Sequence, residues 1–203
     1  MTKQIGSLFL GLISFHFLFA QQNVSKDIYQ SYSTSNFRTN NLFLKKIDPE
    51  NVDYRLLNAA VFFCTNEQRL KYKRKELQHV VELENAAYLH SKQMGELSFF
   101  SHENAFDEKL RVADDRGKIC GIQNPKMAEN IVYFSSNDPS KLTYLELADK
   151  LIAMWKSSKP HWENILSNEA IELGCGVFVV ISGDEKSFYG TQNFQFFDKV
   201  IAK

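Results

Sequence analysis

The sequence predicts an α+β domain in which helices pack against an antiparallel sheet. Apolar residues recur every three or four positions over residues 52–73 and again over 79–94, which is the periodicity of helices with one buried face. Near the C-terminus, residues 171–181 are dense in Val, Ile and Phe, and after a turn residues 188–197 alternate in polarity, as in a β-hairpin. Helices first and strands last, with no internal repeat, indicate one shared core.

Size and charge restrict the class of protein. The chain has 203 residues, of which 44% are hydrophobic and 24% are charged, enough for one globular domain with an additional tail. Lys and Arg together number 24, and Asp and Glu also number 24. Because this balance lacks the basic excess typical of nucleic-acid binders, we expect no nucleic acid among the partners.

The N-terminal segment has the pattern of a secretory signal peptide. Lys3 is the only Lys, Arg, Asp or Glu before a mostly apolar run that ends at Ala20, a small residue of the kind found at cleavage sites. The run is too short for a comfortable membrane span. We expect a signal peptide over 1–20, no stable span after its removal, and a secreted or periplasmic location. An uncleaved anchor is the alternative.

The next segment, residues 21–50, is rich in Asn, Ser, Thr and Gln. We interpret it as a polar leader with little regular structure. At its end, Asp48–Asn51 combines turn residues with acidic groups, which favour the start of a helix. The main domain is therefore predicted to occupy residues 51–203.

Two helices open the domain. Basic residues crowd the C-terminal end of the first, at residues 69–75, where they interact favourably with the helix dipole. Asn66 and Arg69 lie three positions apart on one face of this helix, and we expect them to hold neighbouring loops by hydrogen bonds. The second helix is predicted from His79 to Met94, with Gly95 as its stop.

The middle of the chain is more irregular. A short helix is predicted over Ala105–Asp114, ending at Gly117, followed by a loop that leads to Met127–Ile131. The apolar stripe of residues 144–155 predicts a longer helix. A break at Ser and Pro residues precedes a further helical turn over 161–166.

Cysteine usage is modest, with Cys64, Cys120 and Cys175 as the complete set. An extracytoplasmic location permits disulfides, but three cysteines leave at least one unpaired. A Cys120–Cys175 bridge and three unpaired, partly buried thiols are both compatible with the sequence. It has no CxxC motif and no Cys/His cluster with zinc-site spacing.

Seven motifs occur in a fixed order: Asn66–Arg69, Leu89–Met94, Phe100–His102, Ala128–Ile131, Trp155–Leu166, Leu173–Val177 and Tyr189–Phe194. In this order they closely resemble the bacterial branch of the CAP superfamily, which comprises cysteine-rich secretory proteins, antigen 5 and pathogenesis-related class-one proteins, and whose domain is also called SCP. The resemblance covers about residues 53–197. It implies an α-β-α sandwich with a central antiparallel sheet between helical layers, and a cleft lined by histidines and acidic residues.

The resemblance also implies which residues line that cleft. Animal and plant members carry two histidines and two glutamates there, and His102 and Glu129 match the first of each. Ser158 stands where the second glutamate is usual, and Tyr189 where the second histidine is usual. Bacterial members commonly carry a histidine at the position of His161, which is expected to face the same cleft.

These residue types suit a metal ion as well as a structural role. Neutral imidazole and carboxylate are ordinary zinc ligands, so His102, His161 and Glu129 would just suffice for Zn or another divalent cation. Alternatively, Glu129 accepts hydrogen bonds and fixes a loop, as buried polar groups must in any case. Gln192 is expected in the sheet or at the edge of the cleft, and His90 on a helix face.

The expected function is binding rather than catalysis, and no catalytic residue is assigned. The sequence contains no G-x-S-x-G elbow and no Gly-rich phosphate loop after a strand. The ligand would be a divalent metal ion or a small amphipathic molecule such as a sterol or another lipid, to which the resemblance points. A metal-dependent, peptidase-like extracytoplasmic hydrolase with Glu129 as ligand or general base is the alternative. A third possibility is an interaction domain whose polar cleft is purely structural.

Overall fold

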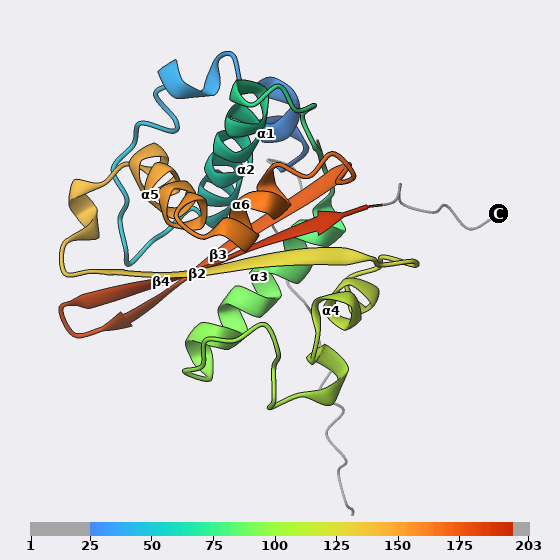
Figure 1. Cartoon of the computed structure of the whole chain (residues 1–203). Coiled ribbons are helices and arrows are strands. Elements are labelled where there is room, and N and C mark those ends of the chain that lie inside the picture. The colour runs from blue at the N-terminus through green and yellow to red at the C-terminus, as the bar shows by residue number, and fades with distance from the viewer. Residues whose placement is uncertain (1–24, 197–203) are drawn as a thin grey trace, which may run out of the picture.

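The computed structural model describes residues 25–196. A four-stranded sheet forms the central layer, and one layer of helices covers each of its faces (Figure 1). The helices are α1 (Ser25–Ser31), α2 (Tyr54–Lys71), α3 (Val81–Glu96), α4 (Ala113–Ile119), α5 (Tyr144–Lys156) and α6 (Lys159–Ile165). The strands are β1 (Gln78–His79), β2 (Met127–Ser136), β3 (Glu172–Ser182) and β4 (Glu185–Gln195). The predicted signal peptide, and Phe197 at the end of the predicted last strand, lie outside the described residues.

The sheet has the strand order β1-β3-β4-β2, so β2 lies at one edge. The predicted hairpin is confirmed, because β3 and β4 pair antiparallel around a turn in which Gly183 has a φ of 58°. β2 pairs antiparallel with β4 along its whole length, from Met127 opposite Gln195 to Ser136 opposite Lys186. β1 runs parallel to β3. The sheet is therefore mixed, whereas the prediction was an antiparallel sheet. β1 was not predicted, because its two residues are too few to show the alternating pattern of a strand in the sequence.

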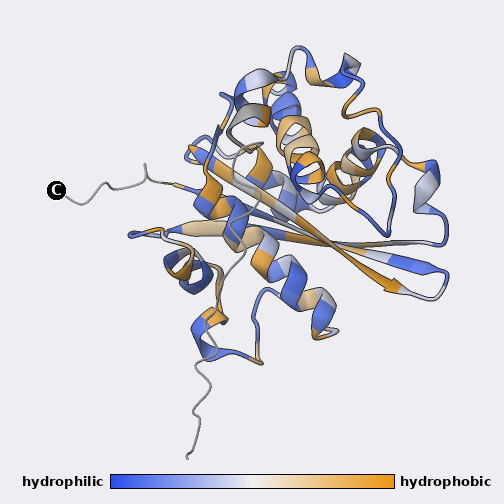
Figure 2. Ribbon diagram, turned by 180° about the vertical axis from the view of Figure 1, so that it is seen from behind, coloured by the Kyte–Doolittle hydropathy of each residue, from blue (hydrophilic) through white to orange (hydrophobic). Residues whose placement is uncertain are grey.

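Helices cover both faces of this sheet, which confirms the predicted α-β-α sandwich. Helices α2, α5 and α6 lie on one face, and α3 and α4 on the other (Figure 1). Hydrophobic residues run along the strands and the helices that cover them, whereas the outer turns are mostly hydrophilic (Figure 2). Helix α3 lies directly on β3, since a Cβ atom at Gly174 or Gly176 would come within 2.1 Å of its backbone.

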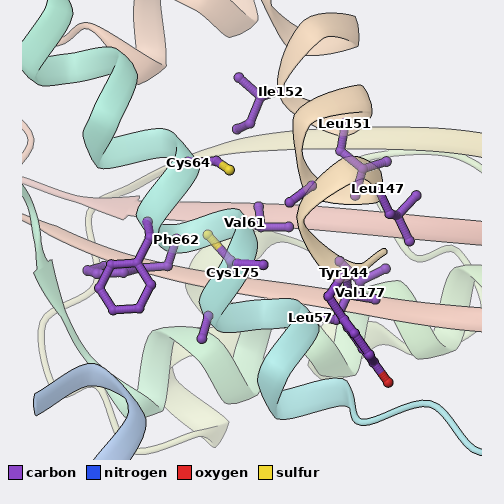
Figure 3. Close-up of a cluster of buried hydrophobic side chains, with 14 of the residues drawn as sticks. Leu57, Val61, Phe62, Cys64, Tyr144, Leu147, Leu151, Ile152, Cys175 and Val177 are labelled. Carbon is purple, nitrogen blue, oxygen red and sulfur yellow. The ribbon is translucent and has the colours of Figure 1, made fainter. Parts of the chain in front are cut away.

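The main core fills the space between α2, α5 and the sheet. Figure 3 draws side chains of this cluster from α2 (Leu57, Val61), α5 (Leu147, Leu151) and β3 (Cys175, Val177). Cys64 and Cys175 are buried in this region, and Cys120 is half-buried at the end of α4. All three cysteines are free, so the structure contains no Cys120–Cys175 bridge. Within residues 25–196, no helix has the length and apolar character needed to cross a membrane.

The segment expected to be a polar leader is part of this core. Phe37, Phe43 and Ile47 are each no more than 1% exposed. The Arg38 guanidinium forms ion pairs with Glu67 of α2 and Asp149 of α5. The apolar residues that anchor the segment are spaced without a regular period. The sequence therefore shows mainly the polar residues between them, which indicate an exposed segment.

Two parts of the helix prediction are corrected by the structure. Gly95 lies inside α3, where it gives Phe178 and Val180 of β3 room to pack; the helix ends after Glu96, and Ser98 then has a φ of 55°. The helix predicted over residues 105–114 is wrong. That stretch begins with a loop, and α4 starts only at Ala113.

The predicted loop-holding role of Asn66 and Arg69 is confirmed. The Asn66 amide donates to the carbonyl of Leu77 and accepts from its N–H. Arg69 donates to the carbonyl of Lys75 and, at 2.7 and 2.9 Å, to those of Ile165 and Ser167. Arg69 therefore fixes the end of α6 against α2, and α6 carries one wall of the cleft described next.

Candidate functional site

A cleft of about 1330 Å³ opens at the free edge of β2. It is bounded by both helical layers, because one wall is the loop after α3 and the other is the corner between α5 and α6. Its lining residues are Ser98, Phe99, Phe100, Ser101, His102, Glu103, Ala105, Phe106, Ile131, Val132, Tyr133, Met154, Trp155, Ser157, Ser158, His161 and Tyr189. Most of this lining is apolar or aromatic, as is usual for small-molecule sites.

The loop wall is fixed by hydrogen bonds from buried side chains and from its own backbone. His90 of α3 is fully buried, and its Nε2 lies 3.0 Å from the carbonyl oxygen of Ser101, to which it donates. The N–H of Asn104 donates to the carbonyl of Arg111 at 2.9 Å, which closes the loop on itself. His102 is thereby held next to β2.

Glu129 of β2 is the centre of the polar network under this wall. Its side chain is only 5% exposed, and its Oε1 lies 3.0 Å from Nδ1 of His102. Its Oε2 accepts from Nη2 of Arg116 at 2.6 Å. Asn193, opposite Glu129 on β4, completes the set: with its oxygen on the N–H of Ala87 at 3.2 Å, its nitrogen lies 3.3 Å from Oε2 of Glu129.

This environment keeps Glu129 ionised. Burial alone would raise the pKa of Glu129, but the hydrogen bond from His102 and the positive charge of Arg116 outweigh it, and the pKa is lowered. An ionised carboxylate can only accept hydrogen bonds. The proton in the contact between His102 and Glu129 therefore belongs to Nδ1 of His102, and Nε2 is left as the ring's free nitrogen.

The opposite wall carries His161. Ser158 is the N-cap of α6 and Pro160 lies in its first turn, a favourable place for proline. The Asn130 amide of β2 donates to the carbonyl of His161 at 3.0 Å and thus fixes α6 on the strand. The ring centroids of His161 and His102 are 6.5 Å apart. Partial burial and the nearby His102 lower the pKa of His161, which favours its neutral form.

The register along β2 gives the cleft a polar and an aromatic end. His102 and His161 contact Glu129 and Asn130, and four residues further along the strand the ring of Tyr133 lies 6.3 Å from that of Phe100 and 5.1 Å from that of Tyr189. At the usual rise per strand residue, the two ends are separated by about 13 Å.

The predicted site residues separate into three groups. His102, His161, Ser158 and Tyr189 all line the cleft. Glu129 lies beneath the lining. Gln192 was expected in the sheet or at the edge of the cleft. It lies within the sheet, in β4, fully buried on the face opposite Glu129, where its amide bonds Thr65 at 2.7 Å and Asn130 at 3.0 Å.

The structure brings two of the three predicted metal ligands, His102 and His161, to the cleft and places the third, Glu129, beneath its lining. Across residues 25–196, no group of three or more His, Cys, Asp and Glu side chains is arranged to hold a metal ion. The physical reason is that Glu129 already engages Arg116 and Asn193, and orients His102 instead of sharing a ligand position with it.

Two important residues of the network escaped the sequence-based prediction. Arg116 lies between two acidic residues and a glycine, in a stretch with no distinctive pattern, although it is fully buried. His90 was expected on a helix face without a role at the site, yet its Nε2 is 3.8 Å from Oε1 of Glu129. Only the nonlocal packing of α3 and α4 against β2 brings these side chains together.

His90 makes the stability of the fold depend on pH. Burial lowers the pKa of His90 to about 4 from its ordinary 6.5, with a smaller opposing effect from Glu129. The unfolded chain therefore binds a proton at His90 more readily than the folded chain does. The contribution of neutral His90 to the free energy of unfolding is fully present above about pH 6.5, and it decreases by about 3 kcal/mol at most as the pH falls toward 4. Urea unfolding between pH 4 and 7.5 measures this loss. His90→Gln should reduce the slope in that window, and an unchanged slope would contradict the assignment.

An α-β-α sandwich with a loop histidine and an edge-strand glutamate at one cleft defines a CAP-type, or SCP, domain. The profile of the cysteine-rich secretory protein (CAP) family matches residues 62–194, and the chain belongs to this family. No curated protein sequence matches the chain.

Solved bacterial structures share the fold. An extracellular SCP-domain protein from Bacillus anthracis str. Ames is similar with a TM-score of 0.52 and 25% identity, over 71% of this chain and 41% of that one. An outer surface protein from Borrelia burgdorferi has a TM-score of 0.52 and 14% identity, over 75% and 98% of the two chains. The CAP domain of enterococcal PrgA gives 0.51 and 14%, over 83% and 77%. This chain thus spans less than half of the Bacillus protein.

Proposed function

We propose that the chain is an extracytoplasmic binding domain whose cleft takes an elongated amphipathic molecule. The observation that carries the proposal is the polarity of the cleft, with two imidazoles at one end and an aromatic cluster at the other. The signal-like N-terminal sequence and the extracellular Bacillus relative support the location.

Exposed apolar side chains support an apolar body for the ligand. Phe100, Phe106, Tyr133 and Met154 all line the cleft, and they are 52%, 65%, 38% and 38% exposed. Apolar patches of this kind on a folded protein commonly mark a binding surface. A hydrocarbon chain or a sterol ring system would cover them.

The imidazoles at the polar end suit a small head group. His102 presents its free Nε2, and the neutral His161 ring offers a second acceptor or donor. A hydroxyl group satisfies both, because it can donate to one ring and accept from the other. Sterols and long-chain alcohols combine such a head with an apolar body.

A direct titration tests this proposal. We expect 1-dodecanol or a sterol to bind the purified protein, monitored by calorimetry, and Phe100→Ala and His161→Ala each to weaken binding about tenfold, a loss of roughly 1.4 kcal/mol. Ile119→Ala is the matched control, because Ile119 is 55% exposed but lies outside the cleft. Absence of binding by the unaltered protein, or an equal effect of Ile119→Ala, would sink the proposal.

A divalent cation held by His102 and His161 is the second candidate. It is favoured by the Glu129 carboxylate on Nδ1 of His102, an arrangement that orients and strengthens histidine ligands in metal sites. Solvent or a ligand head group would complete the coordination. We expect one equivalent of Zn²⁺ to bind and His161→Ala to abolish this binding; equal affinity in the variant would contradict a cation at this position.

The hydrolase alternative has less support from the geometry. This alternative makes Glu129 a metal ligand or a general base. The Glu129 carboxylate is buried and paired with Arg116, however, and its pKa is lowered. A general base works best with a pKa near the working pH. We therefore favour binding over catalysis for this cleft.

A further inference from the structure

Arg116 is a fully buried cation that does not itself line the cleft, although it binds Glu129 beneath the lining. We infer that Arg116 is a positioning residue that fixes which nitrogen of His102 carries the proton, and so makes the polar end of the cleft select ligands with a hydrogen-bond donor in the head group. This inference rests on the proposed binding function and specifies the chemistry of its ligand.

The guanidinium of Arg116 binds both parts of the His102–Glu129 pair. Nη2 donates to Oε2 of Glu129 at 2.6 Å and to the carbonyl of His102 at 3.2 Å. Nη1 donates to the carbonyls of Leu110 and Arg111 at 2.9 and 3.0 Å. One side chain therefore fixes the backbone at His102, the far end of the same loop and the carboxylate that faces the imidazole.

The charge of Arg116 decides how the proton is placed. A buried carboxyl group without a counter-charge favours its neutral form, and a neutral carboxyl group can donate its O–H to Nδ1 of His102. The imidazole would then carry its proton on Nε2 and present a donor to the cleft. With Arg116 in place, Oε2 of Glu129 accepts from Nη2 at 2.6 Å and Oε1 accepts from Nδ1 of His102 at 3.0 Å. Nδ1 therefore carries the proton of the neutral ring, and Nε2 presents a lone pair.

This placement makes a prediction about ligand class. A lone pair on Nε2 accepts a hydrogen bond from a hydroxyl head group, whereas it repels the lone pairs of a carboxylate. The unaltered protein should thus bind 1-dodecanol at least about tenfold more tightly than dodecanoate of the same chain length, a difference of one order of magnitude in Kd.

Glu129→Gln tests the inference without removing Arg116. The amide oxygen can accept from Arg116 while the amide nitrogen donates to Nδ1 of His102, so the proton should move to Nε2. Nitrogen-15 spectra of the histidine rings report this position directly. We expect the proton on Nδ1 in the unaltered protein and in Arg116→Lys, which keeps the charge, and on Nε2 in Glu129→Gln and in Arg116→Met.

The two readouts separate the possible failures. A proton on Nε2 of His102 in the unaltered protein, or on Nδ1 in Glu129→Gln, would overturn the inference, and neither result requires Arg116→Met to fold. The preference for 1-dodecanol should fall at least tenfold in Glu129→Gln, and an unchanged preference would also overturn it. If neither compound binds the unaltered protein, the proposed function fails, whereas the ring spectra still decide the role of Arg116.

Discussion

Replacing Glu129 with leucine is expected to destabilise the fold by about 3–5 kcal/mol, because it leaves a buried positive charge without its partner. Arg116 is fully buried, and Glu129 is its only carboxylate partner among the ion pairs of residues 25–196. The variant also frees Nδ1 of His102. Urea unfolding at pH 7 measures the loss.

The double variant Glu129→Leu with Arg116→Met is the control for this prediction. Removal of both charges avoids the unpaired cation, so the double variant should be more stable than the summed effects of the single variants indicate, by about 2 kcal/mol. Additive effects would show that the two side chains contribute independently. A loss below about 1 kcal/mol for Glu129→Leu would contradict a buried ion pair.

Gly176→Ala is expected to lower the free energy of unfolding by more than about 3 kcal/mol, which is at the upper end of the effects of overpacking. A Cβ atom at this position would lie 2.1 Å from the backbone nitrogen of Tyr88 and 2.4 Å from its Cα. The obstacle is helix backbone, which cannot rotate away as a side chain can. Helix α3 would have to move off the sheet and take His90 with it.

Gly183→Ala provides the comparison. Gly183 has a φ of 58° in the β3–β4 turn and no atom within 4 Å of an added Cβ, so only the backbone conformation is penalised, by about 1 kcal/mol. Thermal unfolding of the two variants measures the difference. Equal losses would mean that the close approach of α3 to β3 does not govern stability.

The sequence predicted those parts of the fold whose signals are local. The apolar stripe that ends at Trp155 corresponds to α5, and the Val- and Ile-rich run before Gly183 corresponds to β3. Each pattern repeats with the period of its own element, so neighbouring residues are sufficient to identify it. The order of motifs then led correctly to the CAP family and its sandwich.

Other parts depend on contacts between distant segments and gave no local signal. β1 is a strand only because Gln78 and His79 pair with β3. Phe37 and Phe43 sit in a polar stretch that becomes core only when it packs on α2 and α5. Arg116 is a residue type that is usually exposed and stands in a polar stretch of the sequence, yet the fold buries it completely.

The site was predictable in its residues more than in their roles. His102 and His161 are 59 positions apart, and they face each other because both helical layers meet at the edge of β2. The sequence could not distinguish Glu129 as a metal ligand from Glu129 as the residue that orients His102. That distinction depends on Arg116 and Asn193, which only the packed structure brings to it.

The histidine rings provide the most direct test of the central claim, which is that a ligand binds between His102 and His161. The rings should be followed by NMR while 1-dodecanol is added to the unaltered protein. We expect the signals of His102 and His161 to shift with saturation, whereas those of His79, which binds Glu84, and of the buried His90 do not. Shifts at His79 or His90 with none at His102 and His161 would contradict it.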